Sequence, residues 1–428
     1  MKNQYFYLLL ILFLNLISCN NQQLSSNNQI VYWSSNNTYE IEFSRAVVKE
    51  WNRLNPNQSV KFQPVPEGQS SEEVILAAVV GKTTPDIYSN MWQGDVEAYA
   101  DAGVLVALDT LPGFLEFLDM RCDSQTIAEV TSRDGHIYQI PWKINPIMLI
   151  SNVNMMNSIG FKKPPATYSQ FLEAGKRFKK DTDGDGYVDQ WVGYSEVIVR
   201  WWQRFFDFYP LYLAATHGAP LVKNNKIVFD NIFAVNVFKF LQTIYKRNYF
   251  SKEWLSARQD VFLSGVIATR FTGPWEIMHA ENFKPEGFEY EFSPMPVPDD
   301  FSGEPYTYCD PKNIVIFNTC KITKIAWEFL KLITNKEKDL LFLEMTNQLP
   351  RRKDIAEDPV FESYFKRNPK MLPFARQAKF VKGTDTSPVL KEIFDIISQE
   401  YEACVVYSKK SPEQAIADAA KAARLIVY

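Results

Sequence analysis

Residues 30–65 read IVYWSSNNTYEIEFSRAVVKEWNRLNPNQSVKFQPV, and this stretch decides the fold. The apolar run from Ile30 to Trp33 predicts a short strand. Apolar residues at helical spacing then predict a helix that stops at Asn55-Pro56. The alternation from Val60 to Val65 predicts a second strand. A strand, a helix and a strand in this order predict a right-handed crossover and a parallel pair.

The same pattern continues along the chain. Ser70 and Glu73 stand three apart as in a capping box, so a helix is expected from there to Gly81. A third strand is expected over Asp86 to Tyr88. Ligands of parallel sheets bind at the carboxyl ends of the strands. The loops at these ends, or just beyond them, offer four candidate ligand-binding residues: Trp33, Glu67, Trp92 and Asp95.

The rest of the chain also alternates strands and helices, which predicts an α/β fold. No long low-complexity linker separates its parts, so two lobes that share several chain crossings are expected. Further strands are predicted over residues 137–142, 147–152, 226–229 and 313–317, and further helices over residues 171–180, 232–246, 325–333 and 412–426.

The amino terminus has the pattern of a lipoprotein signal. An apolar run from Tyr5 to Ile17 follows Lys2 and is too short to span a bilayer comfortably. Ser18-Cys19 ends it as a lipobox does, which predicts a signal peptide over residues 1–18, lipidation of Cys19 and a polar tether over residues 19–28. An ordinary cleaved signal with an incidental cysteine is the alternative. We expect an exported, membrane-anchored lipoprotein that faces the periplasm or the cell exterior.

Composition limits the function further. The 46 basic and 50 acidic residues give a net charge of −4, which does not favour nucleic-acid binding. Aromatic residues make up 14% of the chain, a supply that suits stacking on a ligand. The four other cysteines, Cys122, Cys309, Cys320 and Cys404, include no CxxC pair, which disfavours a metal site of cysteines. An exported context permits disulfides between them, and buried free thiols are the alternative.

Several motifs resemble one family in order and spacing: GKTTPDIYSNMW (residues 81–92), GHIYQIPW to ISNVNMM (135–156), FLSGVIATRFTGPWEI (262–277), and YTYCDPKNIVIF to AWEFLKLIT (306–334). Together with LPRRKD and the terminal helix they resemble family 1 of the extracellular solute-binding proteins, the sugar-binding components of ABC importers. The resemblance covers nearly the whole mature chain. The sequence departs from the family's pattern in two places. Thr269 stands where a methionine is common, and residues 143–146 are unusual.

The resemblance implies a periplasmic-binding-protein-like fold whose two lobes have central sheets flanked by helices and close on a ligand like a hinged clamp. The amino-terminal lobe is expected over residues 29–139 and 309–345, and the carboxy-terminal lobe over residues 140–308 and 346–428. The implied partners are a carbohydrate, such as an oligosaccharide or glycoside, and the permease subunits of an ABC transporter. The protein is expected to be a monomer without a required cofactor.

Further ligand-binding candidates lie near the lobe crossings. The resemblance puts Trp275 at the cleft, although a place in a lobe core is the alternative. Trp142 and Asn145 lie on the crossover, where packing under the hinge is equally plausible. Of the adjacent pair Trp201-Trp202, one ring is expected in the core and the other, assigned to Trp202, in the cleft. Tyr308 and Asp310 near the second crossing complete the set.

A calcium-like loop stands apart from these candidates. Oxygen ligands recur at alternate positions with glycine at position 6, as in an EF-hand, but Val192 replaces the glutamate at position 12. A weak structural calcium and a Gly-Asp-rich turn without metal both fit this pattern. The candidate ligands are Asp181, Asp183, Asp185, Tyr187 and Asp189.

Catalytic motifs are absent from the sequence. There is no phosphate loop, HExxH or GxSxG, and the histidines at 136, 217 and 279 are scattered. Glu67 and Asp95 could serve a glycosidase only if they faced each other. Binding without catalysis is therefore the favoured function, and a surface glycan-active hydrolase or a binder of a non-sugar solute is the alternative.

Overall fold

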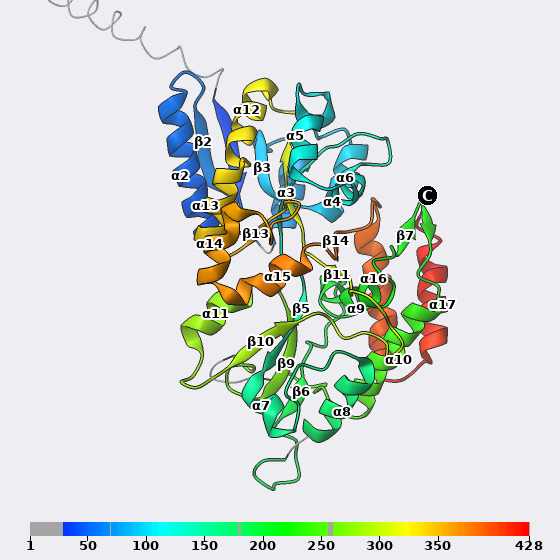
Figure 1. The fold of residues 1–428 in the computed structure, drawn as a ribbon. Coiled ribbons are helices and arrows are strands. Elements are labelled where there is room, and N and C mark those ends of the chain that lie inside the picture. Colours follow the sequence, from blue (N-terminus) through cyan, green and yellow to red (C-terminus); the bar gives the residue numbers. More distant parts are fainter. Residues whose placement is uncertain (1–28, 69, 179–180, 256–259, 428) are drawn as a thin grey trace, which may run out of the picture.

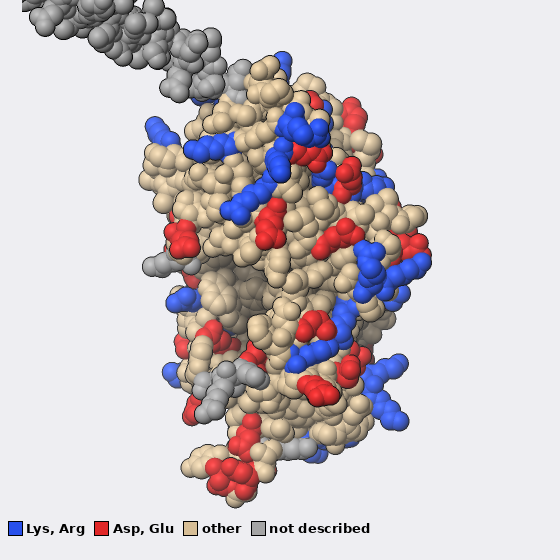
Figure 2. Space-filling view, turned by 90° about the vertical axis from the view of Figure 1, so that its left-hand side faces the viewer, with Lys and Arg blue, Asp and Glu red and all other residues tan. Residues whose placement is uncertain are grey.

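The protein folds as two α/β lobes stacked one above the other (Figure 1). The computed structural model describes residues 29–427 except 69, 179–180 and 256–259. The predicted signal peptide, tether and Cys19 lie outside the described residues, as does the end of the helix expected over 171–180. Among the described residues, no helix is long and apolar enough to cross a membrane. A space-filling view shows the surface hollowed between the lobes on one side (Figure 2).

A six-stranded sheet forms the centre of the first lobe. Its order is β13 (Leu349–Pro350), β4 (Ile140–Ile144), β12 (Lys312–Ile316), β3 (Ile87–Trp92), β1 (Ile30–Ser34) and β2 (Val60–Pro64). β1 pairs in parallel with both β2 and β3, so the predicted parallel sheet is confirmed for these strands. β12, the strand predicted over residues 313–317, runs antiparallel to β3 and β4, and this reversed direction was not predicted.

Helices cover both faces of this sheet, because its strands carry apolar residues on both faces. One face packs against α2 (Thr38–Leu54), α5 (Phe114–Arg121), α12 (Thr323–Ile333) and α13 (Lys336–Thr346). The other face packs against α3 (Ser71–Val80) and α4 (Gln93–Asp101). α6 (Ser124–Val130) follows α5. The predicted ends of α2 and α3 are confirmed, with Asn37 and Ser70 as amino-terminal caps.

A four-stranded sheet forms the centre of the second lobe. Its order is β10 (Tyr290–Ser293), β5 (Met148–Asn152), β9 (Ile267–Thr272) and β6 (Trp191–Gly193). The helices of this part of the chain are α7 (Val153–Ser158), α8 (Tyr168–Phe178), α9 (Phe208–Ala215), α10 (Ile232–Lys246), α11 (Trp275–Phe283), α14 (Pro359–Arg367), α15 (Leu372–Gln377), α16 (Leu390–Tyr401) and α17 (Pro412–Ala423). Two short pairs, β7 (Val222–Lys223) with β8 (Lys226–Ile227) and β11 (Thr307–Tyr308) with β14 (Val381–Lys382), complete the fold.

The sheets extend the first lobe beyond its predicted bounds. β4 pairs with β12 and β13, so residues 140–144 belong to the first sheet, and the chain crosses to the second sheet only before β5. β13 likewise lies past residue 345, where the first lobe was expected to end. The strand expected over 137–142 is found at 140–144 because pairing with β12, which is remote in sequence, fixes its place.

Candidate functional site

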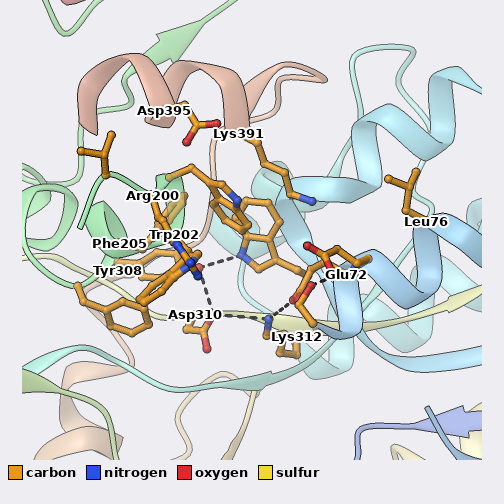
Figure 3. Close-up of a pocket in the computed structure, with 16 residues that line it drawn as sticks. Glu72, Leu76, Arg200, Trp202, Phe205, Tyr308, Asp310, Lys312, Lys391 and Asp395 are labelled. Carbon is orange, nitrogen blue, oxygen red and sulfur yellow. Dashed lines mark hydrogen bonds and ion pairs between the residues drawn. The ribbon is translucent and has the colours of Figure 1, made fainter. Parts of the chain in front are cut away.

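A cavity of about 710 Å³ lies where the two lobes meet. The first lobe contributes α3 and the end of β3, the second lobe contributes a 3₁₀ turn (Trp201–Phe205) and α16, and residues 308–312 come from a crossing segment. Figure 3 shows these side chains converging from both sides. The lining residues are Ser70, Glu72, Glu73, Leu76, Trp92, Val199, Arg200, Trp201, Trp202, Phe205, Phe206, Tyr308, Asp310, Lys312, Lys391 and Asp395.

Aromatic rings form the apolar wall of this cavity. Trp92 is the last residue of β3, and its ring centroid lies 4.9 Å from that of Trp201 and 5.5 Å from that of Phe205. The Trp92 Nε1 donates a hydrogen bond to the Tyr308 hydroxyl at 3.0 Å, so its polar atom is satisfied while the ring is buried. Trp202 also lines the cavity. Flat rings of this kind suit the C–H faces of a sugar.

An ion-paired cluster lies beside the aromatic wall. The antiparallel pairing of β12 with β3 sets Lys312 opposite Trp92 at the end of the sheet. Lys312 Nζ lies 3.0 Å from Glu72 Oε1 and 3.9 Å from Asp310 Oδ1 (Figure 3). Burial raises the pKa of Glu72, but the charge of Lys312 and its hydrogen bond outweigh this and lower the pKa to about 2. The carboxylate is therefore held ionised as a hydrogen-bond acceptor.

The second lobe adds its own charges. Lys391 Nζ lies 2.6 Å from Asp95 Oδ1 of the first lobe, and 5.5 and 5.2 Å from the ring centroids of Trp92 and Trp201. Burial raises the pKa of Asp95, and the charge of Lys391 opposes this. Burial also raises the pKa of Asp395, although the backbone N–H of Trp201 donates to its carboxylate. Hydrogen-bonding groups therefore face the cavity from both lobes.

Four of the ten candidate ligand-binding residues line this cavity: Trp92, Trp202, Tyr308 and Asp310. Both rings of the Trp201-Trp202 pair line the cavity, with Trp202 in the cleft as expected. Trp201, the ring expected in the core, also packs against the hydrophobic core of the second lobe. The pair lies in a short 3₁₀ turn at the lobe edge.

Two candidate tryptophans lie in the first-lobe core instead. Trp142 is fully buried, and its ring centroid lies 6.3 Å from that of Phe43 and 4.6 Å from that of Phe342. Trp33 is buried on the opposite face of the sheet in a cluster with Tyr88. Helices cover both faces of these strands, so neither ring reaches the cavity and the expected ligand contacts are corrected.

The other four candidates lie near the cavity or outside it. Asn145 is buried at the crossing between the lobes, and Glu67 is exposed outside the lining. Asp95 lies behind the cavity wall, so the carboxylate pair suggested for a glycosidase does not line the cavity. Trp275 is 42% exposed, and its ring packs edge-on against that of Phe206, which does line the cavity, at 6.2 Å. Ligand contact by Trp275 stays a prediction.

Several lining residues were not predicted: Glu72, Phe205, Phe206, Lys312 and Lys391 are among them. The capping box at Ser70 marks a helix that starts beside a strand-end loop, and this signal could have found Glu72. No local signal marks Lys312 or Lys391, because their places depend on contacts with residues far away in sequence.

The four cysteines of the described chain are free and buried. Burial raises the pKa of each thiol, to about 11 for Cys122 and about 12 for Cys309. Of the two states left open by the sequence, the structure therefore has buried thiols. They are poor nucleophiles and metal ligands at neutral pH.

The calcium-like loop lies at an exposed tip of the second lobe. Carboxylate oxygens of Asp181, Asp183 and Asp189 lie within 4.8 Å of one another. Asp181 also accepts two backbone N–H groups of the loop, and Asp185 accepts the backbone N–H of Tyr187 at 2.8 Å. These hydrogen bonds form the turn by themselves, and calcium binding stays a prediction.

A family model of bacterial extracellular solute-binding proteins matches residues 46–373. An arabinooligosaccharide-binding protein of Bacillus subtilis is 22% identical over 251 residues, which cover 55% of this chain and 52%, about half, of that protein. A galactooligosaccharide-binding protein of the same organism is 21% identical and covers 73% of this chain and 72% of that protein.

Solved structures have the same fold. An uncharacterized protein of Listeria monocytogenes superposes with a TM-score of 0.82 at 26% identity and covers 94% of this chain and 100% of its own. The sugar-binding protein MalE of Xanthomonas citri superposes with a TM-score of 0.76 at 17% identity and covers 93% and 97%. The expected two-lobed α/β fold is thus confirmed.

Proposed function

This chain belongs to the bacterial extracellular solute-binding protein family, and on that basis we propose that it captures an oligosaccharide between its lobes and delivers it to the permease of an ABC importer. The family consists of exported binding proteins, and two of the matched relatives are named for arabino- and galacto-oligosaccharides. The binding of a sugar without chemical change is part of the proposal.

One observation carries this proposal: aromatic rings and ion-paired charged side chains face each other across the inter-lobe cavity. Trp201 and Trp202 offer flat apolar surfaces, while Glu72, Asp310 and Lys312 offer charged acceptors and donors. A sugar needs both, because its C–H faces stack and its hydroxyls hydrogen-bond. Hydrogen bonds to charged groups contribute about 1.5–3 kcal/mol each.

The charges of the cavity favour a neutral sugar. Lys312 is already paired with Glu72, and Lys391 with Asp95. An anionic ligand would have to compete with carboxylates for both lysines. Hydroxyl groups can instead bridge the paired charges, since each hydroxyl both donates and accepts.

The mechanism that follows is capture and closure. A sugar first stacks on one lobe, and rotation at the chain crossings then brings the other lobe over it. The membrane subunits recognise the closed form. Lipidation at Cys19 would keep the protein beside its permease, and loss of membrane association in a Cys19→Ala variant of the full chain would support this part.

A melting-temperature screen over neutral mono- and oligosaccharides tests the function. A ligand present at 100 times its Kd should stabilise the folded protein by about 2.7 kcal/mol. No shift with any sugar, beside a clear shift with a polyamine or peptide, would reject a carbohydrate ligand. Chromatography of the sugar after long incubation should return it unchanged, whereas shorter products would indicate a hydrolase.

A further inference from the structure

One ion pair joins the two lobes at the wall of the cavity. Asp95 lies in the first turn of α4 in the first lobe, and Lys391 lies in the first turn of α16 in the second. Lys391 Nζ lies 2.6 Å from Asp95 Oδ1. Asp95 is only 8% exposed, so its carboxylate is largely shielded from water in this arrangement of the lobes.

The lysine is held by one ring from each lobe. Its ammonium group lies 5.5 Å from the ring centroid of Trp92 in the first lobe and 5.2 Å from that of Trp201 in the second. Cations over indole rings are attracted at such distances. The two rings also contact each other, with centroids 4.9 Å apart. The ion pair and the ring pair therefore form one continuous contact between the lobes.

Some other ion pairs lie within a single lobe. Lys312 and Glu72 both belong to the first lobe, and Lys410 pairs at 2.8 Å or less with Glu400 and Asp418 of the second lobe. These pairs do not change when the lobes move apart.

The Asp95–Lys391 pair does change. When the lobes separate, its partners part and water can reach the carboxylate. When the lobes are together, the carboxylate is buried and depends on the ammonium, because a buried charge without a partner is strongly unfavourable. Removal of Lys391 therefore penalises the closed arrangement more than the open one.

We propose that Asp95 and Lys391 form an inter-lobe latch that stabilises the closed arrangement and so sets ligand affinity without Asp95 contacting the ligand. The link to affinity rests on the proposed function, whereas the effect on closure does not. The apparent Kd rises as the fraction of closed, binding-competent protein falls. Asp95 is thus a positioning residue, whereas the sequence places it among the candidate ligand-binding residues.

The test compares Lys391→Met, Asp95→Asn and the double variant with wild type and with a matched control. Lys410→Met is that control, since Lys410 and Lys391 are 33% and 32% exposed but Lys410 pairs within one lobe. Small-angle scattering without sugar measures closure as a radius of gyration. Thermal melting checks that each variant folds, and the charge-reversed pair Asp95→Lys with Lys391→Asp tests for rescue.

We expect a larger radius of gyration for Lys391→Met than for wild type or Lys410→Met. The double variant should be more compact than Lys391→Met, because no unpaired charge remains to be buried. Equal radii for Lys391→Met and Lys410→Met, or purely additive effects, would overturn the latch.

A binding arm uses a neutral galacto-oligosaccharide mixture as the probe. Lys391→Met should weaken any wild-type binding at least about tenfold, in line with the lost closed fraction, and unchanged affinity would overturn the latch. If no sugar binds wild type while the scattering result holds, the latch stands and the carbohydrate assignment fails.

Discussion

At the scale of single residues, the cavity wall contains two kinds of side chain: aromatic rings that stack and charged groups that form ion pairs. The rings of Trp201 and Trp92 are in contact across the lobe boundary, and the Tyr308 hydroxyl accepts a hydrogen bond from the indole N–H of Trp92. Glu72 and Lys312 neutralise each other a short distance away. The Trp92 indole and the Glu72–Lys312 pair are thus oriented by their neighbours, which lowers the entropy lost when a ligand binds.

Trp201→Ala should weaken sugar binding because it removes a ring from the cavity wall and the partner of Trp92. A loss of about 2 kcal/mol, or about 30-fold in Kd, is expected from lost burial and stacking. Isothermal titration calorimetry with the sugar found in the screen measures it. Trp254→Ala is the control, since Trp254 is 72% exposed and does not line the cavity. Equal losses in both variants would contradict the assignment of the site.

Glu72 should make the free energy of unfolding depend on pH. Its pKa is lowered from 4.5 to about 2 in the folded protein, because Lys312 outweighs the effect of burial. The stabilisation is then fully present above about pH 4.5 and is lost as the pH falls toward 2. Glu72→Gln should lower the free energy of unfolding by about 1–3 kcal/mol at pH 7, with a smaller difference at pH 3.

Urea unfolding at a series of pH values measures the Glu72 effect. Glu73→Gln is the matched control, because the next residue of the same helix has an exposed side chain. A pH-independent difference between wild type and Glu72→Gln would show that the ion pair with Lys312 is not its source.

Sequence reasoning found some of these residues and missed others for a physical reason. Trp92 and Tyr308 could be predicted because strand ends and crossings mark sheet edges where ligands bind. Lys312 could not, since only its antiparallel pairing brings it opposite Trp92, 220 residues away. Trp142 was misplaced because a strand in the sheet centre has helices on both faces, which its own residues do not reveal.

At the scale of elements, local chemistry fixes helix ends while distant contacts fix strand membership. The Asn37 side chain accepts the N–H groups of Tyr39 and Glu40, and Ser70 accepts that of Glu73. Caps of this kind act within one turn, so the starts of α2 and α3 could be predicted. β4 depends on β12 and β13 for its place, and its bounds could not be predicted.

Gly94 in the first turn of α4 should be intolerant of a side chain. An added Cβ would lie 2.2 Å from the Trp92 ring, which folds back over this residue. Gly94→Ala should displace that ring, lower stability by about 1–3 kcal/mol and weaken sugar binding. Chemical unfolding and calorimetric titration measure the two effects.

Gly175→Ala is the control for Gly94→Ala, because it separates the loss of stability from the loss of sugar affinity. An added Cβ there would lie 2.6 Å from the Tyr249 ring in the second-lobe core, away from the cavity lining. This variant should lose stability and keep its affinity. If Gly94→Ala also kept its affinity, the Trp92 ring would not be part of the binding site.

At the scale of the whole molecule, the chain passes repeatedly between the lobes. It crosses from β4 to β5, returns from β11 to β12, and leaves the first sheet again after β13 (Figure 1). Each crossing is short, so the lobes can rotate about the crossings and move apart at the cavity while they stay joined there. Such an arrangement couples ligand capture to closure. It also makes each lobe depend on segments that are distant in sequence.

This dependence predicts how fragments of the chain behave. Residues 29–146 hold β1 to β4 but lack β12, which lies between β4 and β3 in the sheet. The fragment also lacks β13, so β4 would have no partner strand and β3 would have an unpaired edge, and the fully buried Ile314, Val315 and Ile316 would be lost. It should show no cooperative melting transition by circular dichroism. Residues 29–146 joined through a flexible linker to residues 311–350 should restore one, because the sheet is then complete. Cooperative melting of the short fragment alone would mean that the first lobe folds before its returning strand arrives.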